Sequence, residues 1–288
     1  MNFLKSMFIS NYMMLAMASS GYSGWMLYQG ESVIAWGGVM LTAGPVMMMI
    51  SWLMMFKSVA RTSARFPLLN LLGAVGTGLA VWSWLGQGGS VLPAVLALVG
   101  WAGFIMYAYW YSSFGRKASH KLKLGAVLPS FTLKDVKGAL VSSTKLADKP
   151  TVLIFYRGNW CPLCMAQVKE LASRYQEISA LGVRIALISP QPHSNTVSLA
   201  KKLGVDFDFL TDEGNAAARA LGINVAFGLP LGMQMMGYNS ETVLPTVVIT
   251  DKSGKVLWAH ETDNYRIRPE PDVYLDVLRH NGMLSASA

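Results

Sequence analysis

Arg157-Gly158-Asn159-Trp160-Cys161-Pro162-Leu163-Cys164 is the stretch that decides the fold of the C-terminal part of this 288-residue chain. It contains both cysteines of the sequence, follows a short apolar run over residues 151–156, and precedes a helix-like run that begins near Pro162. This order predicts a strand followed by a helix, with the Cys-x-x-Cys pair at the helix N-terminus. There the helix dipole and the free backbone N–H groups stabilise a thiolate. The pair is therefore predicted to be redox-active, and to form and break a disulfide with an outside partner.

A zinc site and a structural disulfide are the two alternatives for the cysteine pair. Structural zinc sites hold four ligands, whereas this sequence offers one cysteine pair and four scattered histidines. A disulfide that closes so short a loop removes little chain entropy from the unfolded state. We therefore expect no metal at the pair. We also expect no organic cofactor, because the sequence contains no glycine-rich phosphate loop.

The composition changes sharply near residue 115. Before that point the basic residues are Lys5, Lys57, Arg61 and Arg65, and the acidic residue is Glu31; the remaining 20 basic and 15 acidic residues lie from Arg116 onward. The sequence therefore predicts a transmembrane helical anchor domain over residues 1–115, followed by a water-soluble α/β domain over residues 116–288.

Three charge-free stretches are long enough to cross a bilayer core of roughly 30 Å: Val33–Phe56, Leu68–Leu85 and Val91–Tyr111. A fourth stretch, Met7–Leu27, is diluted by polar residues and is either a further span or a signal peptide. We thus expect three or four transmembrane helices. Small residues four apart, such as Gly73 and Thr77, indicate close helix packing; this leaves open whether the helices also form a homo-oligomer.

Basic residues predict the orientation of these spans. Two clusters are separated by two spans and so lie on one side: Lys57, Arg61 and Arg65, then Arg116, Lys117, Lys121 and Lys123. By the positive-inside rule that side is cytoplasmic. We therefore expect an integral protein of the inner (cytoplasmic) membrane with its soluble domain in the cytoplasm. The net charge of +8 is then explained by topology and by anionic headgroups, and we expect no nucleic-acid partner.

From residue 131 onward, strand-like and helix-like runs alternate. Residues 151–156 and 183–189 read as buried strands, and residues 167–180 as a helix. Residues 246–250 and 255–260 flank the turn Asp251-Lys252-Ser253-Gly254. A closing helix follows over residues 271–279. The pattern predicts a central mixed sheet with helices on both faces.

The segment Phe155–Cys164 resembles the peroxiredoxin-like branch of the AhpC/TSA redoxins, within the thioredoxin superfamily. The segments Ile188-Ser189-Pro190-Gln191 and Leu244-Pro245-Thr246-Val247-Val248-Ile249-Thr250-Asp251 are also similar to that branch. The resemblance covers about residues 124–281 and leaves the membrane half outside. It implies a thioredoxin-like fold and thiol chemistry.

The resemblance implies two different roles for the two sulfurs. In thioredoxin-like reductases the first cysteine, here Cys161, attacks a disulfide and the second, here Cys164, resolves the mixed disulfide. In peroxiredoxins a threonine stands three residues before the peroxide-attacking cysteine, which places Cys164 in the peroxidatic position and Cys161 in that of the threonine. Those enzymes also use an arginine just before the late strand. Here that position holds Pro245, which resembles the cis-proline of thioredoxins, so a cis peptide bond is expected before it. The absence of the threonine and of the arginine favours dithiol chemistry over a dedicated peroxidase.

Other residues near the motif are candidates for binding or activation. Trp160 resembles the tryptophan that flanks thioredoxin active sites. Arg157 either lowers a cysteine pKa by its charge or is a solvated residue at the end of a strand. Pro162, and Pro245 with its neighbour Thr246, complete the candidate set. The apolar, glycine-rich segment 226–242 is expected either to pack over the Cys161 site or to rest on the membrane surface.

The leading hypothesis is a membrane-anchored, cytosol-facing thiol–disulfide oxidoreductase that uses the Cys-Pro-Leu-Cys pair. Its partners are the lipid bilayer, a thiol electron donor such as a thioredoxin-type protein, and a disulfide-containing protein or a peroxide as substrate. One alternative is a thiol-dependent peroxidase with Cys164 peroxidatic and Cys161 resolving. Another is a non-catalytic redox sensor or assembly factor for a membrane partner.

Overall fold

The computed structural model describes residues 2–283 and divides into two compact units. The first unit contains Phe3–Phe56 and Ser63–Phe114. The second contains Lys57–Thr62 and the chain from Gly115 onward. A short segment of the N-terminal half thus belongs to the C-terminal unit, although the sequence predicts a single boundary near residue 115.

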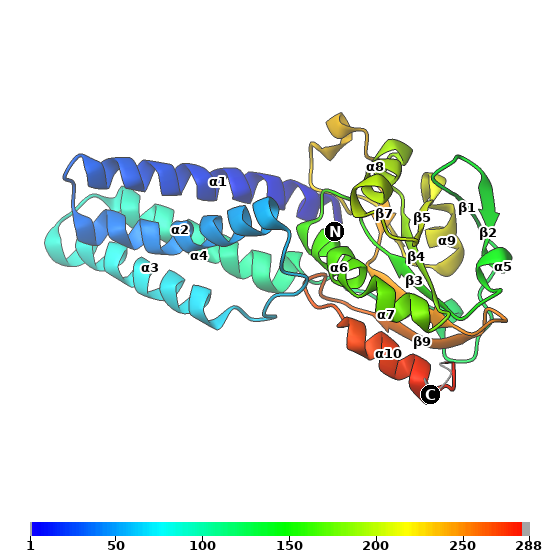
Figure 1. The fold of residues 1–288 in the computed structure, drawn as a ribbon. Helices are drawn as coiled ribbons and strands as arrows, with labels where there is room; N and C mark the ends of the chain where they lie inside the picture. Colours follow the sequence, from blue (N-terminus) through cyan, green and yellow to red (C-terminus); the bar gives the residue numbers. More distant parts are fainter. Residues whose placement is uncertain (1, 284–288) are drawn as a thin grey trace. The chain divides into compact units, whose positions relative to one another are not determined.

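The first unit is a helical bundle. Its helices are α1 (Asn2–Tyr28), α2 (Val33–Phe56), α3 (Pro67–Gln87) and α4 (Val91–Ile105), and a π-helical turn, η1 (Met106–Tyr111), continues α4 (Figure 1). Within the described residues, three helical stretches are long and apolar enough to cross a membrane: Val33–Phe56, Pro67–Gln87 and Val91–Tyr111. The three strongest predicted spans are therefore confirmed as helices of membrane-spanning length, and the fourth stretch lies within α1.

Small residues bring the helices of this unit close together. A Cβ atom added at Gly76 would lie 2.5 Å from the carbonyl oxygen of Gly38 on α2, and one added at Gly73 would meet the Trp101 ring. The Thr77 hydroxyl donates a hydrogen bond of 3.3 Å to the carbonyl oxygen of Ala97 on α4. The predicted close packing at Gly73 and Thr77 is therefore packing within one chain.

The second unit is built on a seven-stranded mixed sheet in the order β2-β1-β5-β4-β3-β8-β9. Its strands are β1 (Thr132–Lys134), β2 (Leu140–Ser142), β3 (Thr151–Phe155), β4 (Arg184–Ser189), β5 (Asp208–Thr211), β8 (Thr246–Thr250) and β9 (Val256–Glu261). β3, β4 and β5 are parallel, and the remaining pairs are antiparallel. A separate two-stranded sheet joins β6 (Asn224–Val225) to β7 (Thr242–Val243). The predicted mixed sheet is confirmed.

Helices cover this sheet. They are α5 (Ser143–Leu146), α6 (Pro162–Ser173), α7 (Tyr175–Ala180), α8 (His193–Leu203), α9 (Ala216–Leu221) and α10 (Pro271–His280), with short 3₁₀ turns η2 (His120–Leu122), η3 (Glu213–Asn215) and η4 (Met233–Met236). The predicted helix through residue 180 is divided at Arg174, whose φ of −104° and ψ of 16° end α6. Helical periodicity alone does not reveal such a break, because both pieces present the same apolar stripe.

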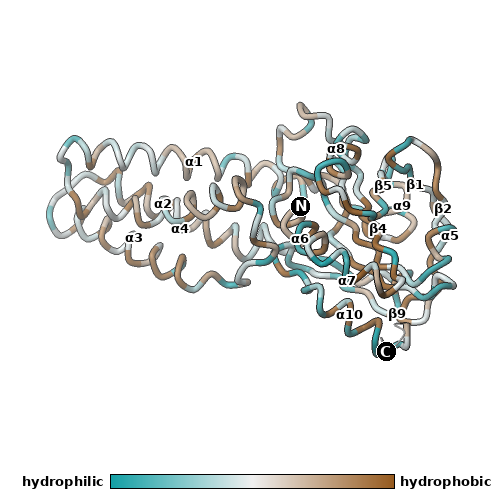
Figure 2. The backbone as a smooth tube through the Cα atoms, viewed as in Figure 1, coloured by the Kyte–Doolittle hydropathy of each residue, from teal (hydrophilic) through white to brown (hydrophobic). Residues whose placement is uncertain are grey.

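The core lies on both faces of β3. Leu153 and Phe155 belong to a cluster with Leu146 of α5 and Leu221 of α9. Val152 and Ile154 alternate with them along the strand and are equally buried. Side chains on alternate positions point to opposite faces, so β3 is covered on both sides, as its uninterrupted apolar sequence predicts. In Figure 2 the hydrophobic colour is strong at β4, next to β3, whereas α7 is hydrophilic.

Candidate active site

Both cysteines lie where β3 gives way to α6. Cys161 is the N-cap of α6, and its Sγ accepts the backbone N–H of Cys164 at 3.4 Å. Pro162 occupies the first helical position, where a missing N–H costs no hydrogen bond. The two sulfur atoms lie 2.6 Å apart as free thiols. Their exposed fractions are 1% for Cys161 and 0% for Cys164, so the pair sits inside the domain.

A guanidinium group faces the two sulfurs. Nη2 of Arg268 lies 3.3 Å from Cys164 Sγ and 4.0 Å from Cys161 Sγ. Nη1 of the same residue donates to Gln167 Oε1 at 2.9 Å, and Gln167 Nε2 donates to the Tyr274 hydroxyl at 2.8 Å. Arg268 is only 5% exposed. One charged group is thus held against the dithiol by residues of α6 and α10.

Sequence reasoning missed Arg268. It stands in the segment between β9 and α10, 104 residues from Cys164. Its only local signal is the run Arg266-Ile267-Arg268-Pro269, which a solvated surface loop would display equally well. The sequence does not reveal that Arg268 is buried without a carboxylate beside it, because this depends on the fold.

The surroundings separate the pKa values of the two thiols. Burial raises the pKa of Cys164, but the hydrogen bond from Cys161 and the positive charge of Arg268 outweigh it and lower this pKa to about 5. The backbone and the charge of Arg157 add to the lowering. Burial and the hydrogen bond to Cys164 raise the pKa of Cys161 well above its ordinary value. At neutral pH the site therefore favours a Cys164 thiolate that accepts a hydrogen bond from the Cys161 thiol.

Arg157 and Trp160 form the wall beside the pair. The Arg157 guanidinium lies 4.6 Å from the centroid of the Trp160 ring and 5.7 Å from that of Tyr265. The indole N–H of Trp160 donates to the Arg157 carbonyl oxygen at 3.3 Å. Arg157 is 4% exposed; a solvated strand-end position, the other interpretation of this residue, does not apply.

The segment 226–242 is attached to this wall. Nη2 of Arg157 donates to the carbonyl oxygen of Gly228, and the Tyr238 ring lies against Gly158. Gly158 has a φ of 140°, and a Cβ there would also collide with Trp160, so this position requires glycine. The segment thus contacts the loop that leads to Cys161, which agrees with the expectation that it packs over the Cys161 site. Contact with a membrane surface stays a prediction.

The structure corrects the prediction for the peptide bond before Pro245. Every described peptide bond is trans, so the prediction of a cis-proline is wrong. Pro245 links β7 to β8, its carbonyl oxygen accepts a hydrogen bond of 3.1 Å from Arg116, and the Thr246 hydroxyl donates to Leu244 O at 2.8 Å. These bonds hold an extended connection between two strands, for which the trans isomer, the more stable for X-Pro, is suited.

Pro245 and Thr246 nevertheless lie near the dithiol. They line a small cavity of about 10 Å³ together with Phe155, Gln167, Thr262 and Arg268, roughly the space that one water molecule needs. Arg116 holds Thr246 in place: its guanidinium donates a hydrogen bond to the Thr246 hydroxyl and forms an ion pair of 2.7 Å with Glu261. All seven candidate residues from the sequence are thus in or next to one site.

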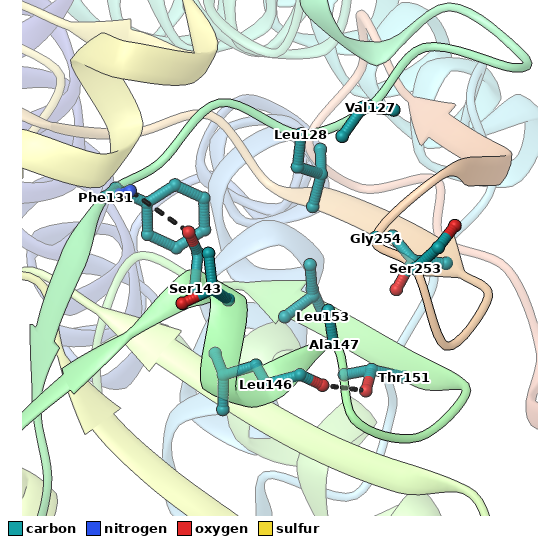
Figure 3. Close-up of a pocket in the computed structure, with 12 residues that line it drawn as sticks. Val127, Leu128, Phe131, Ser143, Leu146, Ala147, Thr151, Leu153, Ser253 and Gly254 are labelled. Atoms are coloured by element: carbon teal, nitrogen blue, oxygen red, sulfur yellow. Dashed lines mark hydrogen bonds between the residues drawn. The ribbon is translucent and has the colours of Figure 1, made fainter.

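A larger cavity of about 70 Å³ lies elsewhere (Figure 3). Its lining includes Val127, Leu128, Phe131 and Leu146, and Thr151 at the start of β3. The cysteines follow the other end of that strand. The lining has no titratable side chain, and we do not assign this cavity to the active site. Among residues 2–283, no group of three or more His, Cys, Asp or Glu side chains is arranged to hold a metal ion.

Comparisons with known proteins agree with this geometry. Residues 124–259 match the model of the AhpC/TSA family. The chain is 30% identical over 154 residues to the chloroplastic peroxiredoxin Q of Triticum aestivum, a match that covers 53% of this chain and 64% of that protein. It is 34% identical over 103 residues to the peroxiredoxin Q of Populus jackii, covering 36% of this chain and 48% of that one. The chain thus spans less than two thirds of the length of these relatives.

Two solved structures are each similar to a little over half of the chain. Peroxidoxin BcpB from Mycobacterium tuberculosis superposes with a TM-score of 0.47 at 22% identity, over 55% of this chain and 97% of that one. Reduced Prx3 from Vibrio vulnificus in complex with H₂O₂ superposes with a TM-score of 0.47 at 19% identity, over 54% and 98%.

The expected thioredoxin-like α/β fold rests on the mixed sheet itself and on the family match. The family match begins at residue 124 and runs through β3, the cysteine pair and β8. The second unit of this chain therefore contains a region, residues 124–259, that matches the AhpC/TSA family, and the first unit is an N-terminal bundle with three helices long and apolar enough to cross a membrane.

Proposed function

We propose that this protein is a membrane-anchored thiol peroxidase in which Cys164 attacks the peroxide and Cys161 resolves the product. The observation that carries the proposal is the placement of Arg268, whose Nη2 lies 3.3 Å from Cys164 Sγ inside a buried site. A cation at that distance favours the thiolate form of the nearer sulfur. The thiolate is the nucleophile in thiol chemistry, so the more activated sulfur is Cys164.

The reaction balances with the groups at the site. The Cys164 thiolate attacks one peroxide oxygen; an S–O bond forms, the O–O bond breaks, and the leaving hydroxide takes the proton of the Cys161 thiol to become water. Cys161, now a thiolate, attacks the sulfur of the Cys164 sulfenic acid; the S–S bond forms, the S–O bond breaks and hydroxide leaves. Two electrons pass from the two thiols to the peroxide. An external dithiol, such as a thioredoxin-type protein, reduces the disulfide again.

Arg268 also suits substrate binding. Its Nε is buried and has no hydrogen-bond partner among the described groups, and the residue lines the small cavity beside Pro245 and Thr246. A buried donor without a partner carries a free-energy cost, which a peroxide oxygen would remove. The small cavity and the burial of both sulfurs favour hydrogen peroxide over a protein disulfide as the direct oxidant.

A disulfide reductase is the second candidate, and one observation favours it. Cys161 is the N-cap of α6 and accepts the Cys164 N–H, a place where the helix N-terminus stabilises a thiolate on Cys161. In that scheme Cys161 attacks the substrate disulfide and Cys164 releases the product. The raised pKa of Cys161, caused by burial and by its hydrogen bond to Cys164, weighs against this assignment.

The location we propose is the inner (cytoplasmic) membrane, with the redoxin domain on the cytoplasmic side. The three helices of spanning length support membrane insertion. The exposed basic residues Arg65, Lys117, Lys121 and Lys123 support the orientation by the positive-inside rule. Arg61 and Arg116 support it less, because each pairs with carboxylates of the second unit.

Single-cysteine variants of the full-length protein in detergent micelles or nanodiscs separate the schemes. The reduced protein is mixed with hydrogen peroxide in stopped flow, and dimedone traps any sulfenic acid. We expect Cys161→Ser to react as fast as the wild type and to accumulate a dimedone adduct at Cys164, because the attacking sulfur is still present. Cys164→Ser should react no faster than a free thiol.

Other results would support a different nucleophile, a disulfide reductase or a redox sensor. If Cys164→Ser keeps the fast reaction, the assignment of the nucleophile is wrong. If the wild type reacts no faster than a free thiol but reduces a protein disulfide through Cys161, the protein is a reductase. A protein that oxidises once and does not turn over with a thiol donor is a sensor.

A further inference from the structure

The segment Lys57–Thr62, between α2 and α3 in the sequence, is a structural part of the redoxin unit. Ala60 at its centre is 2% exposed. The backbone N–H of Thr62 donates to the Arg266 carbonyl oxygen at 3.2 Å, and Nη1 of Arg266 donates to the Thr62 hydroxyl at 3.3 Å. The segment therefore runs against the loop that leads to Arg268.

Arg61 binds two parts of the site at once. Its Nη1 and Nη2 donate to the two carboxylate oxygens of Glu170 on α6, at 3.1 and 2.6 Å. Its Nε donates to the carbonyl oxygen of Arg268 at 3.3 Å, and Nη2 also donates to that of Pro269 at 3.4 Å. One guanidinium thus joins the helix that carries Cys164 to the backbone of the residue that faces Cys164.

Lys57 adds a third attachment. Its Nζ donates to the carbonyl oxygen of Asn159 at 3.1 Å, two residues before Cys161. The segment therefore contacts the loop before the cysteines, the helix after them, and the loop of Arg268.

The Arg268 loop depends on such contacts. Residues 267–270 have no regular secondary structure, so no ladder of backbone hydrogen bonds fixes them. Besides the bonds from Arg61, this loop is held through side chains: the Arg268 guanidinium bonds to Gln167 and faces the two cysteine sulfurs, and the Tyr274 hydroxyl donates to Pro269 O at 3.4 Å. The position of the Arg268 guanidinium is thus set partly from a segment of the N-terminal half.

We infer that Arg61 is a positioning residue for the dithiol: by holding the backbone of Arg268 against α6, it keeps the Arg268 guanidinium on Cys164 and so keeps that sulfur ionised. This inference deepens the proposed function and rests on it for its catalytic consequence. It assigns the inter-span segment Lys57–Thr62 a role beyond linking two helices.

Arg61→Ala in the full-length protein tests this, and Arg174→Ala is the matched control. Arg174 also makes a forked bond to one carboxylate, Glu177, and a second ion pair, with Asp272, but it does not contact the Arg268 loop. The thiolate absorbance at 240 nm is followed against pH, and the oxidation rate by hydrogen peroxide is measured beside it. We expect Arg61→Ala to raise the thiolate midpoint and to slow oxidation by about tenfold to a hundredfold, the range that a misplaced catalytic group costs.

Arg61→Lys keeps the charge but not the forked geometry, and should give intermediate values; it also covers the case in which Arg61→Ala does not fold. Arg174→Ala should match the wild type in both readouts. The inference is overturned if the Arg61 variants, folded by circular dichroism, titrate and react as Arg174→Ala does. The titration needs no peroxide, so a wild type that is inert to peroxide would refute the proposed function and still leave the positioning role measurable.

Discussion

At the level of single residues, Arg268 supplies the positive charge that the sequence lacks at the position of Pro245. The family resemblance leads one to expect an arginine at the position of Pro245, and its absence made a dedicated peroxidase look unfavourable. The structure places a guanidinium 3.3 Å from Cys164 Sγ from a different segment. A charge acts through its distance in space and not through its place in the chain, so a proline before β8 does not exclude thiolate activation.

The pH dependence of oxidation follows from the lowered pKa of Cys164. Because the thiolate reacts, the rate should rise as the pH passes through about 5 and stay level from pH 6 to 8. Arg268→Gln removes the charge, so the pKa of Cys164 should rise and the whole curve should move to higher pH. Each unit by which that pKa exceeds the assay pH removes about a factor of ten in thiolate.

Stopped-flow rates of the full-length protein between pH 4.5 and 9 measure this shift, at about half-unit steps. The control is Arg279→Gln, because Arg279 is an exposed arginine of α10 that pairs with Asp276. An Arg268→Gln curve that coincides with that of the control would refute the role of Arg268.

At the level of elements, close approach between α2 and α3 depends on glycine. A Cβ at Gly76 would lie 2.5 Å from the backbone oxygen of Gly38, which cannot rotate away, whereas at Gly78, two residues further on, nothing lies within 4 Å. Small residues that let helix backbones approach are typical of packed membrane helices. The two glycines of one helix are therefore predicted to differ in their tolerance of a methyl group.

Gly76→Ala should destabilise the bundle by about 1–3 kcal/mol, the usual cost of overpacking, whereas Gly78→Ala should be neutral or slightly stabilising, because alanine is the better helix former. Thermal unfolding of the full-length protein in detergent, followed by fluorescence-detected size exclusion, compares the two. Equal unfolding temperatures for both variants would show that α2 and α3 do not pack at Gly76 in this way.

At the level of the whole molecule, charge and hydropathy divide the chain into a part suited to lipid and a part suited to water. The proposed orientation follows from exposed lysines and arginines that flank the spans, since positive charge is retained on the cytoplasmic side. A C-terminal green fluorescent protein fusion in a bacterial host should therefore fluoresce, and a C-terminal alkaline phosphatase fusion should be inactive. The matched control is an alkaline phosphatase fusion after Gln87, in the uncharged loop before α4, which should be active. The reverse pattern would place the redoxin domain outside the cytoplasm.

Local patterns predicted most of the elements. The hairpin β8–β9 and the helix α10 were predicted from turn residues and periodicity, because such signals act between near neighbours. The break at Arg174 and the trans bond at Pro245 were not predicted. Both depend on how the chain continues through tertiary hydrogen bonds: Arg174 with Asp272 at the start of α10, and Pro245 with Arg116.

The sequence by itself determined the two-part organisation, the strand-to-helix context of the dithiol and its redox character, because composition and short-range spacing carry all three. In the proposed function, only the tertiary structure distinguishes the activated sulfur from the resolving one. That choice depends on Arg268, 104 residues from Cys164, and on Arg61, 109 residues from its partner Glu170. Electrostatic stabilisation acts over a few ångströms, and the packing of distant segments sets those distances.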